Sequence, residues 1–247
     1  MRNLVILFLF PFVFHAQNTE TFKIGLGTDF RKFKMEELNS QLNDENYIQS
    51  DIVEDVLISD GVNHKLTISY QPCRFFNLGI YAAYQFGSAK RKIVISEDSQ
   101  GYPIVPIIGT TYYDVKAISV GIYTELLLNN LSIWPNYSFL SKIEANFTLQ
   151  TGFVKNLFFV YSKYNNTLTN PYKARFTSEG IQLISLLKLG YILTDNNYFS
   201  SIGGAFGYQF FRVSDLKNHS DGSYPQDKDT KLDFSGLSLG VYITIGR

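Results

Sequence analysis

The feature that most constrains the fold is an alternation of apolar and polar residues that recurs in eight segments of the chain. In the clearest segment, Leu140 to Gly152, Phe147 and Leu149 alternate with Asn146 and Thr148. Successive side chains of a β-strand point to opposite sides, so each segment predicts a strand with one apolar face. The segments are Phe22 to Phe33, His64 to Gln71, Leu78 to Phe86, Tyr113 to Leu128, Leu140 to Gly152, Ile181 to Leu193, Ile202 to Phe210 and Leu237 to Ile245.

The connections between these segments alternate in length. The shorter ones are Pro72 to Asn77, Asn129 to Phe139 and Asp195 to Asn197, and the other four are longer. An even number of strands with short turns at one end and long loops at the other is typical of bacterial outer-membrane barrels. The prediction is therefore an all-β fold, an eight-stranded antiparallel up-and-down transmembrane β-barrel with long outer loops, whose strands have the roughly 9 to 11 residues that a tilted spanning strand needs.

The first residues have the pattern of an export signal. Arg2 precedes an apolar run from Leu4 to Phe14, and Ala16 follows that run. Such a run is shorter than the roughly 20 residues of a spanning helix, and Pro11 would break a helix there. We expect residues 1–16 to be a signal peptide and residues 17–247 to be the barrel domain.

Composition narrows the classes of function. Lysine and arginine number 22, as do aspartate and glutamate, and this balance gives no electrostatic footprint for nucleic acid. The chain has 21 Phe, 17 Tyr and 18 Gly against one Trp, and residue pairs at segment ends predict interfacial aromatic girdles. Those clusters are Phe75 with Phe76, Tyr112 with Tyr113, Trp134 with Tyr137 and Phe139, and Phe210 with Phe211.

The polar faces carry charges of both signs, which favours a polar interior with an internal network of salt bridges. These residues are Lys23, Asp29, Arg31, Lys65, Glu125, Lys142, Glu144 and Lys188. Eight strands enclose an interior that side chains just fill, so a diffusive porin is not expected, whereas a narrow ion path stays open as an alternative. The other alternative is a secreted soluble barrel of lipocalin type, in which the apolar face would point inward. Near Ser235 and Gly236 the alternation slips, which predicts a β-bulge.

These features resemble the small outer-membrane β-barrel proteins of Bacteroidetes-type bacteria, the group of OmpX-like and PorT-like barrels. The resemblance rests on the leader that ends in Ala16 and Gln17, the up-and-down pattern, and the final run from Tyr242 to Arg247. It implies the barrel architecture. PorT-like members are associated with a secretion system, and no residue here singles out that branch.

Two predicted outer loops carry concentrated charge. The first, Lys34 to Val62, is acidic, and the spacing of Met35, Leu38 and Leu42 predicts a short amphipathic helix there. Such a loop could gather divalent cations, dock a basic partner, or simply be solvated. In the second, the run Lys90 to Lys92 is suited to lipid phosphates, and a generic cluster of rim charges explains it equally well.

No catalytic, cofactor-binding or metal-binding residue is assigned, and the protein is not expected to be an enzyme. The run Asn218 to Asp221 contains His219 and Ser220, but adjacent side chains in an extended loop point apart, which is poor geometry for a catalytic pair. The stretch Asp227 to Asp229 lacks the glycine-bearing loop of a calcium site.

The expectation for function is a structural or interaction role in the cell outer membrane, reached through the cleaved signal peptide. This includes the option of a subunit of a surface, secretion or uptake complex. Expected partners are outer-membrane lipids and a protein docked on the long outer loops, with no nucleic acid and no cofactor. A lipid-modifying outer-membrane enzyme and the lipocalin-like carrier are the alternatives.

Overall fold

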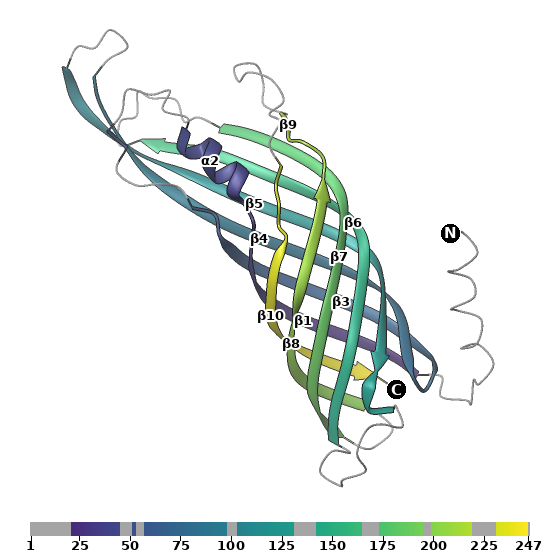
Figure 1. Ribbon diagram of the computed structural model, residues 1–247. Helices are drawn as coiled ribbons and strands as arrows, with labels where there is room; N and C mark the ends of the chain where they lie inside the picture. The colour runs from purple at the N-terminus through teal and green to yellow at the C-terminus, as the bar shows by residue number, and fades with distance from the viewer. Residues whose placement is uncertain are drawn as a thin grey trace.

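The computed structural model describes residues 21–44, 51–52, 57–97, 103–130, 142–164, 173–194, 199–218 and 231–246. Within these ranges the chain forms one antiparallel sheet that curls into a ring (Figure 1). The eight ring strands are β1 (Thr21–Lys32), β3 (Asp60–Cys73), β4 (Phe76–Glu97), β5 (Pro103–Leu127), β6 (Ile143–Tyr164), β7 (Lys173–Thr194), β8 (Phe199–Val213) and β10 (Gly236–Gly246). The predicted architecture is confirmed.

Pairing of the first ring strand with the last closes the ring. β1 runs antiparallel to β10 from the pair Lys23 and Gly246 to the pair Arg31 and Ser238. Every other ring strand pairs with its neighbours in chain order, including β4 with β5. A closed ring leaves no open sheet edge within its height, the condition for a β-sheet inside a lipid bilayer.

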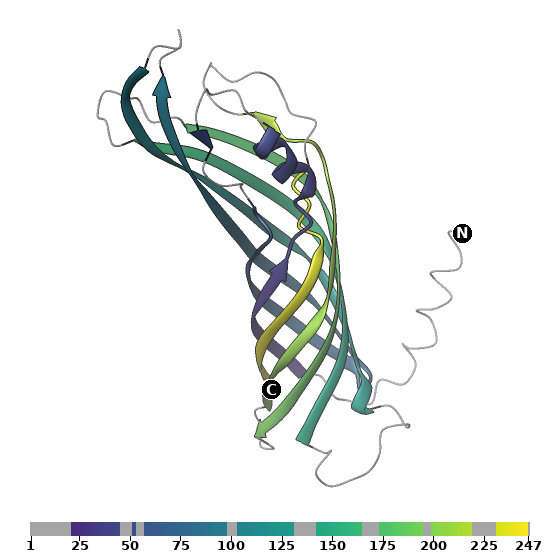
Figure 2. The same cartoon turned by 60° about the vertical axis from the view of Figure 1, so that its left-hand side comes forward.

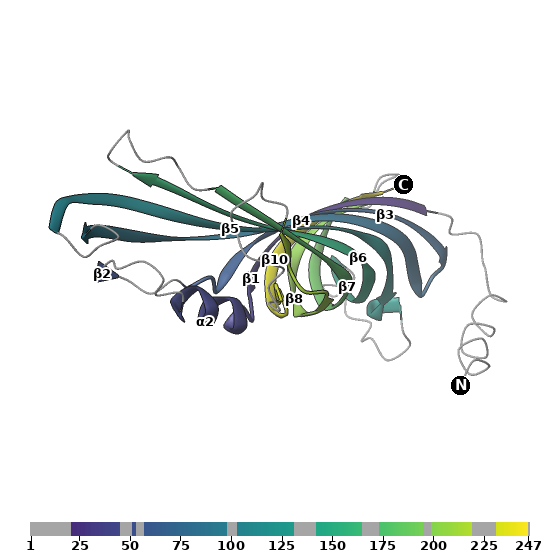
Figure 3. The ribbon, with the colours of Figure 1, turned by 90° about the horizontal axis from the view of Figure 1, so that it is seen from above.

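The strands on one side of the ring are much longer than predicted. β4, β6 and β7 have 22 residues each and β5 has 25, whereas β1 has 12 and β10 has 11. Since a tilted spanning strand needs roughly 9 to 11 residues, these four strands continue past the ring as an open sheet, here called the extension (Figures 1 and 3). Most of the residues predicted as the second and third long loops are therefore strand.

Short segments cover the concave side and the edges of the extension. Helix α2 (Glu36–Asp44) confirms the predicted amphipathic helix and lies against the inner side (Figure 2). The two-residue strand β2 (Asp51–Ile52) pairs with β4, and β9 (Lys217–Asn218) pairs with β7. The two outermost strands of the extension thus each have part of their free edge paired, which limits strand pairing with other chains.

The outer wall of the ring is apolar and its inner side is mostly polar. Large apolar side chains are exposed at outward positions of all eight strands, such as Phe22 on β1 and Phe153 on β6, which are 65% and 74% exposed. Polar side chains such as Gln150 and Gln182 are buried inside. This is the inverse of the lipocalin arrangement, and a wall of this kind is stable against hydrocarbon.

The upper limit of the apolar wall is marked by charge. Moving along each strand toward the extension, the first charged outward residue comes directly after a large apolar outward residue on five strands. We call these residues the charged rim: Lys32 on β1, Lys116 on β5, Lys155 on β6, Glu179 on β7 and Arg212 on β8. β1 begins and β10 ends at the opposite margin, where the tight turn at Arg74 and Phe75 also lies (Figure 1).

Two sequence predictions are wrong because aromatic side chains point into the barrel: the β-bulge near Ser235 and the interfacial girdle at Tyr113 and Phe211. β10 pairs with β1 and β8 without a register shift, so the slip near Ser235 and Gly236 is not a bulge within β10. Instead, Phe234 points inward and is fully buried, and Tyr113 at the start of the fourth predicted segment is buried in the same layer. Tyr113 and the partly buried Phe211 therefore pack inside and do not belong to an interfacial girdle. The cluster of Trp134, Tyr137 and Phe139 lies outside the described residues.

Inside the ring, glycines accommodate tyrosines of other strands. A Cβ atom added at Gly152 would lie 2.6 Å from the Tyr81 hydroxyl, and one at Gly79 would lie 2.6 Å from the Tyr123 ring. Tyr81 and Tyr123 are 3% and 5% exposed. Rings that cover glycines in this way fill the narrow interior and fix the register between strands.

We expect Gly152→Ala to destabilise the barrel by about 1–3 kcal/mol, because the added methyl group would meet the Val120 carbonyl oxygen and the Tyr81 hydroxyl in the narrow interior. Gly204→Ala is the matched control, since its Cβ would have a single neighbour, the Gly240 carbonyl oxygen at 3.7 Å. Urea unfolding of both variants in lipid vesicles measures the difference. Equal unfolding midpoints would contradict this account of the interior.

Candidate functional site

The first candidate site is the polar interior, where buried charges pair across strands. Asp29 on β1 accepts from Arg31 Nη2 at 3.0 Å and lies 3.6 Å from Lys65 Nζ on β3. The same carboxylate accepts from Asn63 Nδ2 at 3.1 Å, and Arg31 Nη1 donates to Gln85 Oε1 on β4 at 3.1 Å. All five side chains are buried, so this group joins three strands through charge-assisted hydrogen bonds.

A second group centres on Glu125 of β5. Its Oε1 accepts from Lys188 Nζ on β7 at 2.7 Å, and its Oε2 accepts from Asn77 Nδ2 on β4 at 2.7 Å. Thr148 Oγ1 donates to Glu125 Oε1 at 3.2 Å, and Lys188 Nζ lies 5.2 Å from the centre of the Tyr242 ring. This group joins β4, β5, β6 and β7, and its Lys188 also lies beside Tyr242 of β10.

Seven of the eight charges predicted for the interior are on inward positions of the ring strands: Lys23, Asp29, Arg31, Lys65, Glu125, Glu144 and Lys188. The prediction is wrong for Lys142, which precedes β6 and is exposed. A cavity of about 30 Å³ lies between Asp29, Lys65 and Lys188, large enough for about one water molecule. At these levels the described side chains fill the interior with ion pairs and packing around this small cavity.

Above this polar layer the interior becomes apolar. We call this layer the apolar lid: Phe33, Met35, Leu38, Leu42, Ile58, Tyr113, Val115, Ala117, Val154, Phe158, Ala174, Phe176, Leu216, Leu232 and Phe234. Phe33 and Phe234 meet edge to face with centroids 5.0 Å apart, and Val115 and Phe234 are completely buried. A dry layer of this kind opposes the passage of ions and polar solutes because it offers them no replacement for hydration.

Hydrogen bonds from Asn39 and to its last turn hold helix α2 in the apolar lid. Asn39 Nδ2 donates to the Ile58 carbonyl at 3.1 Å, and the Ile58 amide donates to Asn39 Oδ1 at 2.9 Å. Arg91 Nη2 of β4 donates to the Leu42 carbonyl at 2.9 Å and to Asn43 Oδ1 at 2.5 Å. α2 has no basic residue in its last turn, so Arg91 supplies the cation that a helix C-terminus favours.

Arg91 therefore corrects the prediction of a rim cluster at Lys90 to Lys92. Arg91 is 5% exposed and points inward, whereas Lys90 and Lys92 are exposed on the outer side. A signal for this was present in the sequence, because Gly87, Ala89 and Arg91 continue the inward positions of β4.

The outer side of the extension is the second candidate site. Lys116 Nζ and Arg175 Cζ lie 5.2 Å and 5.8 Å from the centre of the same ring, that of Phe159 on β6. Tyr112 and Tyr161 stack with centroids 4.8 Å apart, and Lys163 Nζ is 5.4 Å from the Tyr112 centroid. We call this surface the basic face: Lys90, Lys92, Tyr112, Lys116, Phe159, Tyr161, Lys163, Lys173 and Arg175, with Asp114 among them. It starts at the charged rim and suits phosphate or sulfate groups near a membrane surface.

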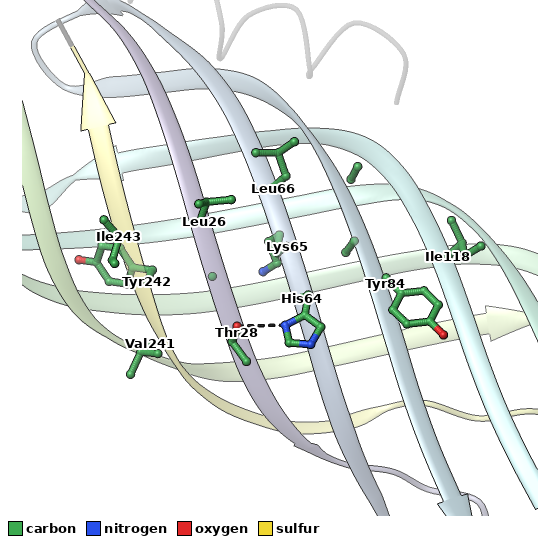
Figure 4. A pocket seen from close by; sticks show the side chains of 13 residues that line it. Leu26, Thr28, His64, Lys65, Leu66, Tyr84, Ile118, Val241, Tyr242 and Ile243 are labelled. Atoms are coloured by element: carbon green, nitrogen blue, oxygen red, sulfur yellow. Dashed lines mark hydrogen bonds between the residues drawn. The ribbon is translucent and has the colours of Figure 1, made fainter.

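A groove on the lipid-facing wall is the third candidate site. It has a volume of about 710 Å³ and crosses β10, β1, β3, β4 and β5 (Figure 4). Leu26, Leu66 and Ile118 line it together with a polar pair, because His64 Nδ1 lies 3.1 Å from Thr28 Oγ1. His64 shares its face with Leu66, so the alternation of β3 already placed it on the outer wall.

Other sequence candidates have no support in the described residues. His219, Ser220, Asp221 and the stretch Asp227 to Asp229 lie outside them, as do residues 45–50 and 53–56 of the acidic loop. Among the residues with described positions, no three His, Cys, Asp or Glu side chains form a group that could hold a metal ion. The same residues include no helix long and apolar enough to cross a membrane.

Comparison with known proteins gives structural likeness only. No family model and no curated protein matches the chain. Among solved structures, Neisserial surface protein A has 11% identity and a TM-score of 0.41 over 91% of this chain and 96% of its own. The attachment invasion locus protein of Yersinia pestis, in complex with the heparin analogue sucrose octasulfate, has 12% identity and a TM-score of 0.34 over 92% and 96%.

A further similar structure is the outer membrane protease OmpT from Escherichia coli, with 11% identity and a TM-score of 0.34 over 92% of this chain and 94% of its own. These values assign no family and no activity. The fold described above rests on the strand pairing of this chain alone.

The contact between Arg91 and α2 leads to a prediction. Arg91→Met should raise the hydrogen exchange of α2 amides about tenfold, because hydrogen bonds from a charged donor contribute roughly 1.5–3 kcal/mol. Lys92→Met on the same strand is the control, as Lys92 is exposed on the outer side. Exchange measured by mass spectrometry in detergent micelles should separate the two variants; the same protection in both would show that Arg91 does not hold the helix.

Proposed function

We propose that this chain is an exported outer-membrane β-barrel protein with a structural or interaction role, in which residues 1–16 are a cleaved signal peptide and residues 17–247 are the mature barrel. The observation that carries the proposal is the combination of an apolar outer wall with an interior closed by ion pairs and the apolar lid. Such a barrel spans a membrane without serving as a diffusive pore. We place it in the Bacteroidetes-type group on the sequence resemblance alone.

The extension supports a role in interaction. It stands beyond the charged rim, its inner side is filled by α2, and its outer side is the basic face. Cations next to aromatic rings at the membrane surface suit the phosphate groups of outer-membrane lipids. A protein partner, such as another subunit of a surface, secretion or uptake complex, would dock on the extension and the loops that join its strands.

The proposal predicts that the purified protein forms no steady channel. The full-length chain is expressed with its leader, recovered from the outer-membrane fraction, checked for a mature mass that starts at Gln17, and added to planar lipid bilayers. We expect no sustained conductance, with a general porin prepared in parallel as the positive control. Sustained single-channel openings would refute the sealed interior, and recovery from the periplasm or medium would refute the membrane location.

A further inference from the structure

The groove on the lipid-facing wall, here called the wall groove, has polar side chains at one end and apolar side chains at the other. One row of paired outward residues contains Val241, Thr28, His64, Tyr84 and Ile118. The next row, toward the tight-turn end of the barrel, is apolar and contains Ile243, Leu26, Leu66 and Ala82. The polar pair therefore lies at the end of the groove nearer the extension, and an apolar floor continues from it toward the middle of the wall (Figure 4).

Cationic groups continue this order beyond the polar pair. In the row above His64, Lys116 pairs with Phe86, and it belongs to the charged rim. Beyond that row, Lys90 and Lys92 on β4 carry the basic face onward. From the middle of the wall outward, the order is an apolar trough, a hydrogen-bonding pair, a row in which Lys116 follows the apolar residues Phe30, Val62 and Phe86, and then further positive charges. The polar and cationic groups thus lie on the extension side of the trough, as the linkage and headgroup lie at one end of the acyl chains of a membrane lipid.

His64 has a geometry suited to a lipid carbonyl. Its Nδ1 engages Thr28, and its ring packs beside Phe86 with centroids 6.1 Å apart. When the Thr28 hydroxyl donates to Nδ1, the ring proton lies on Nε2 and becomes a donor on the outer wall. A donor among apolar side chains is costly without an acceptor, so a ligand that brings a carbonyl oxygen is favoured there.

We propose that the wall groove binds one acyl chain of a phosphorylated glycolipid of the outer leaflet. A carbonyl oxygen of the acyl linkage accepts from His64 Nε2, and a phosphate of the headgroup lies at Lys116. The groove volume of about 710 Å³ is within the usual range of small-molecule sites, and the several cations beyond it match more than one phosphate, unlike a zwitterionic phospholipid. This inference rests on the proposed function, because the leaflet follows from the outer-membrane location.

The test uses the full-length mature barrel, purified from the outer-membrane fraction, stripped of lipid in detergent and titrated with diphosphoryl lipid A as the probe. Native mass spectrometry counts the bound lipid. The variants are His64→Leu and Thr28→Val, and Ser185→Leu is the control because Ser185 is a polar outward residue on β7, away from the groove. Phosphatidylethanolamine serves as the competing phospholipid.

We expect one lipid A per wild-type barrel, with occupancy about three- to tenfold lower in His64→Leu and in Thr28→Val and unchanged in Ser185→Leu. Equal binding of all four proteins, or equal binding of phosphatidylethanolamine by the wild type, would overturn the inference. Folding of each variant is checked by the heat-dependent shift of its band on a denaturing gel, and Thr28→Val decides the outcome if His64→Leu does not fold. Since every protein comes from the outer-membrane fraction, failure of the groove leaves the proposed location standing, whereas absence from that fraction refutes the location itself.

Discussion

Closure of the ring by the pairing of β1 with β10 is the constraint on which the rest of the structure depends. Hydrocarbon offers no hydrogen-bond partner to the backbone, so a sheet can face it only when no edge is open. The ladder from Lys23 with Gly246 to Arg31 with Ser238 meets this requirement at the seam. Once the ring is closed, the outward positions can be apolar, and every charge of the ring strands has to be placed inside or beyond the wall.

The narrow interior then determines how those charges are held. Asp29 and Glu125 each accept from cationic and amide donors of other strands, so the charges stabilise the ring while they fill it. Glycines such as Gly79 and Gly152 leave room for tyrosine rings at the same levels. The apolar lid above needs no ion pairs, because α2 and the segment around Phe234 bring apolar side chains over the inner side of the extension.

The sequence predicted the ring well and the extension poorly, and the reason is visible in β7. Between Leu193 and Ile181 the outward side is mostly apolar, whereas beyond Glu179 the charged residues Arg175 and Lys173 face outward and Phe176 faces inward. The alternation reverses its polarity where the strand leaves the lipid. A search for outward apolar residues therefore ends at the charged rim and takes the remaining strand for a loop.

The same reversal explains two of the individual errors. The sequence pattern places Arg91 and Tyr113 at the surface, whereas their positions along β4 and β5 place them inside. The error at Lys142 has another cause: this residue continues the alternation of β6, but that strand begins at Ile143. The alternation in Ile181 to Leu193 does not fix the orientation of β7, because the apolar residues Ile184 and Leu186 share a face with Gln182; in the structure all three are buried on the inner face. The groove depends on which residues of five strands lie side by side, and that register is not contained in any single segment.

The most direct test of the account is a spin-label scan along β6 in lipid vesicles, in a Cys73→Ser background that removes the one native thiol. Labels are placed at the outward positions Phe147, Leu149, Phe153, Leu157 and Tyr161, and collisions with oxygen and with a water-soluble nickel complex are compared. The account predicts that oxygen dominates through Phe153 and that nickel dominates from Leu157 onward. Dominance of nickel along the whole strand, or of oxygen through Tyr161, would contradict a membrane boundary at the charged rim.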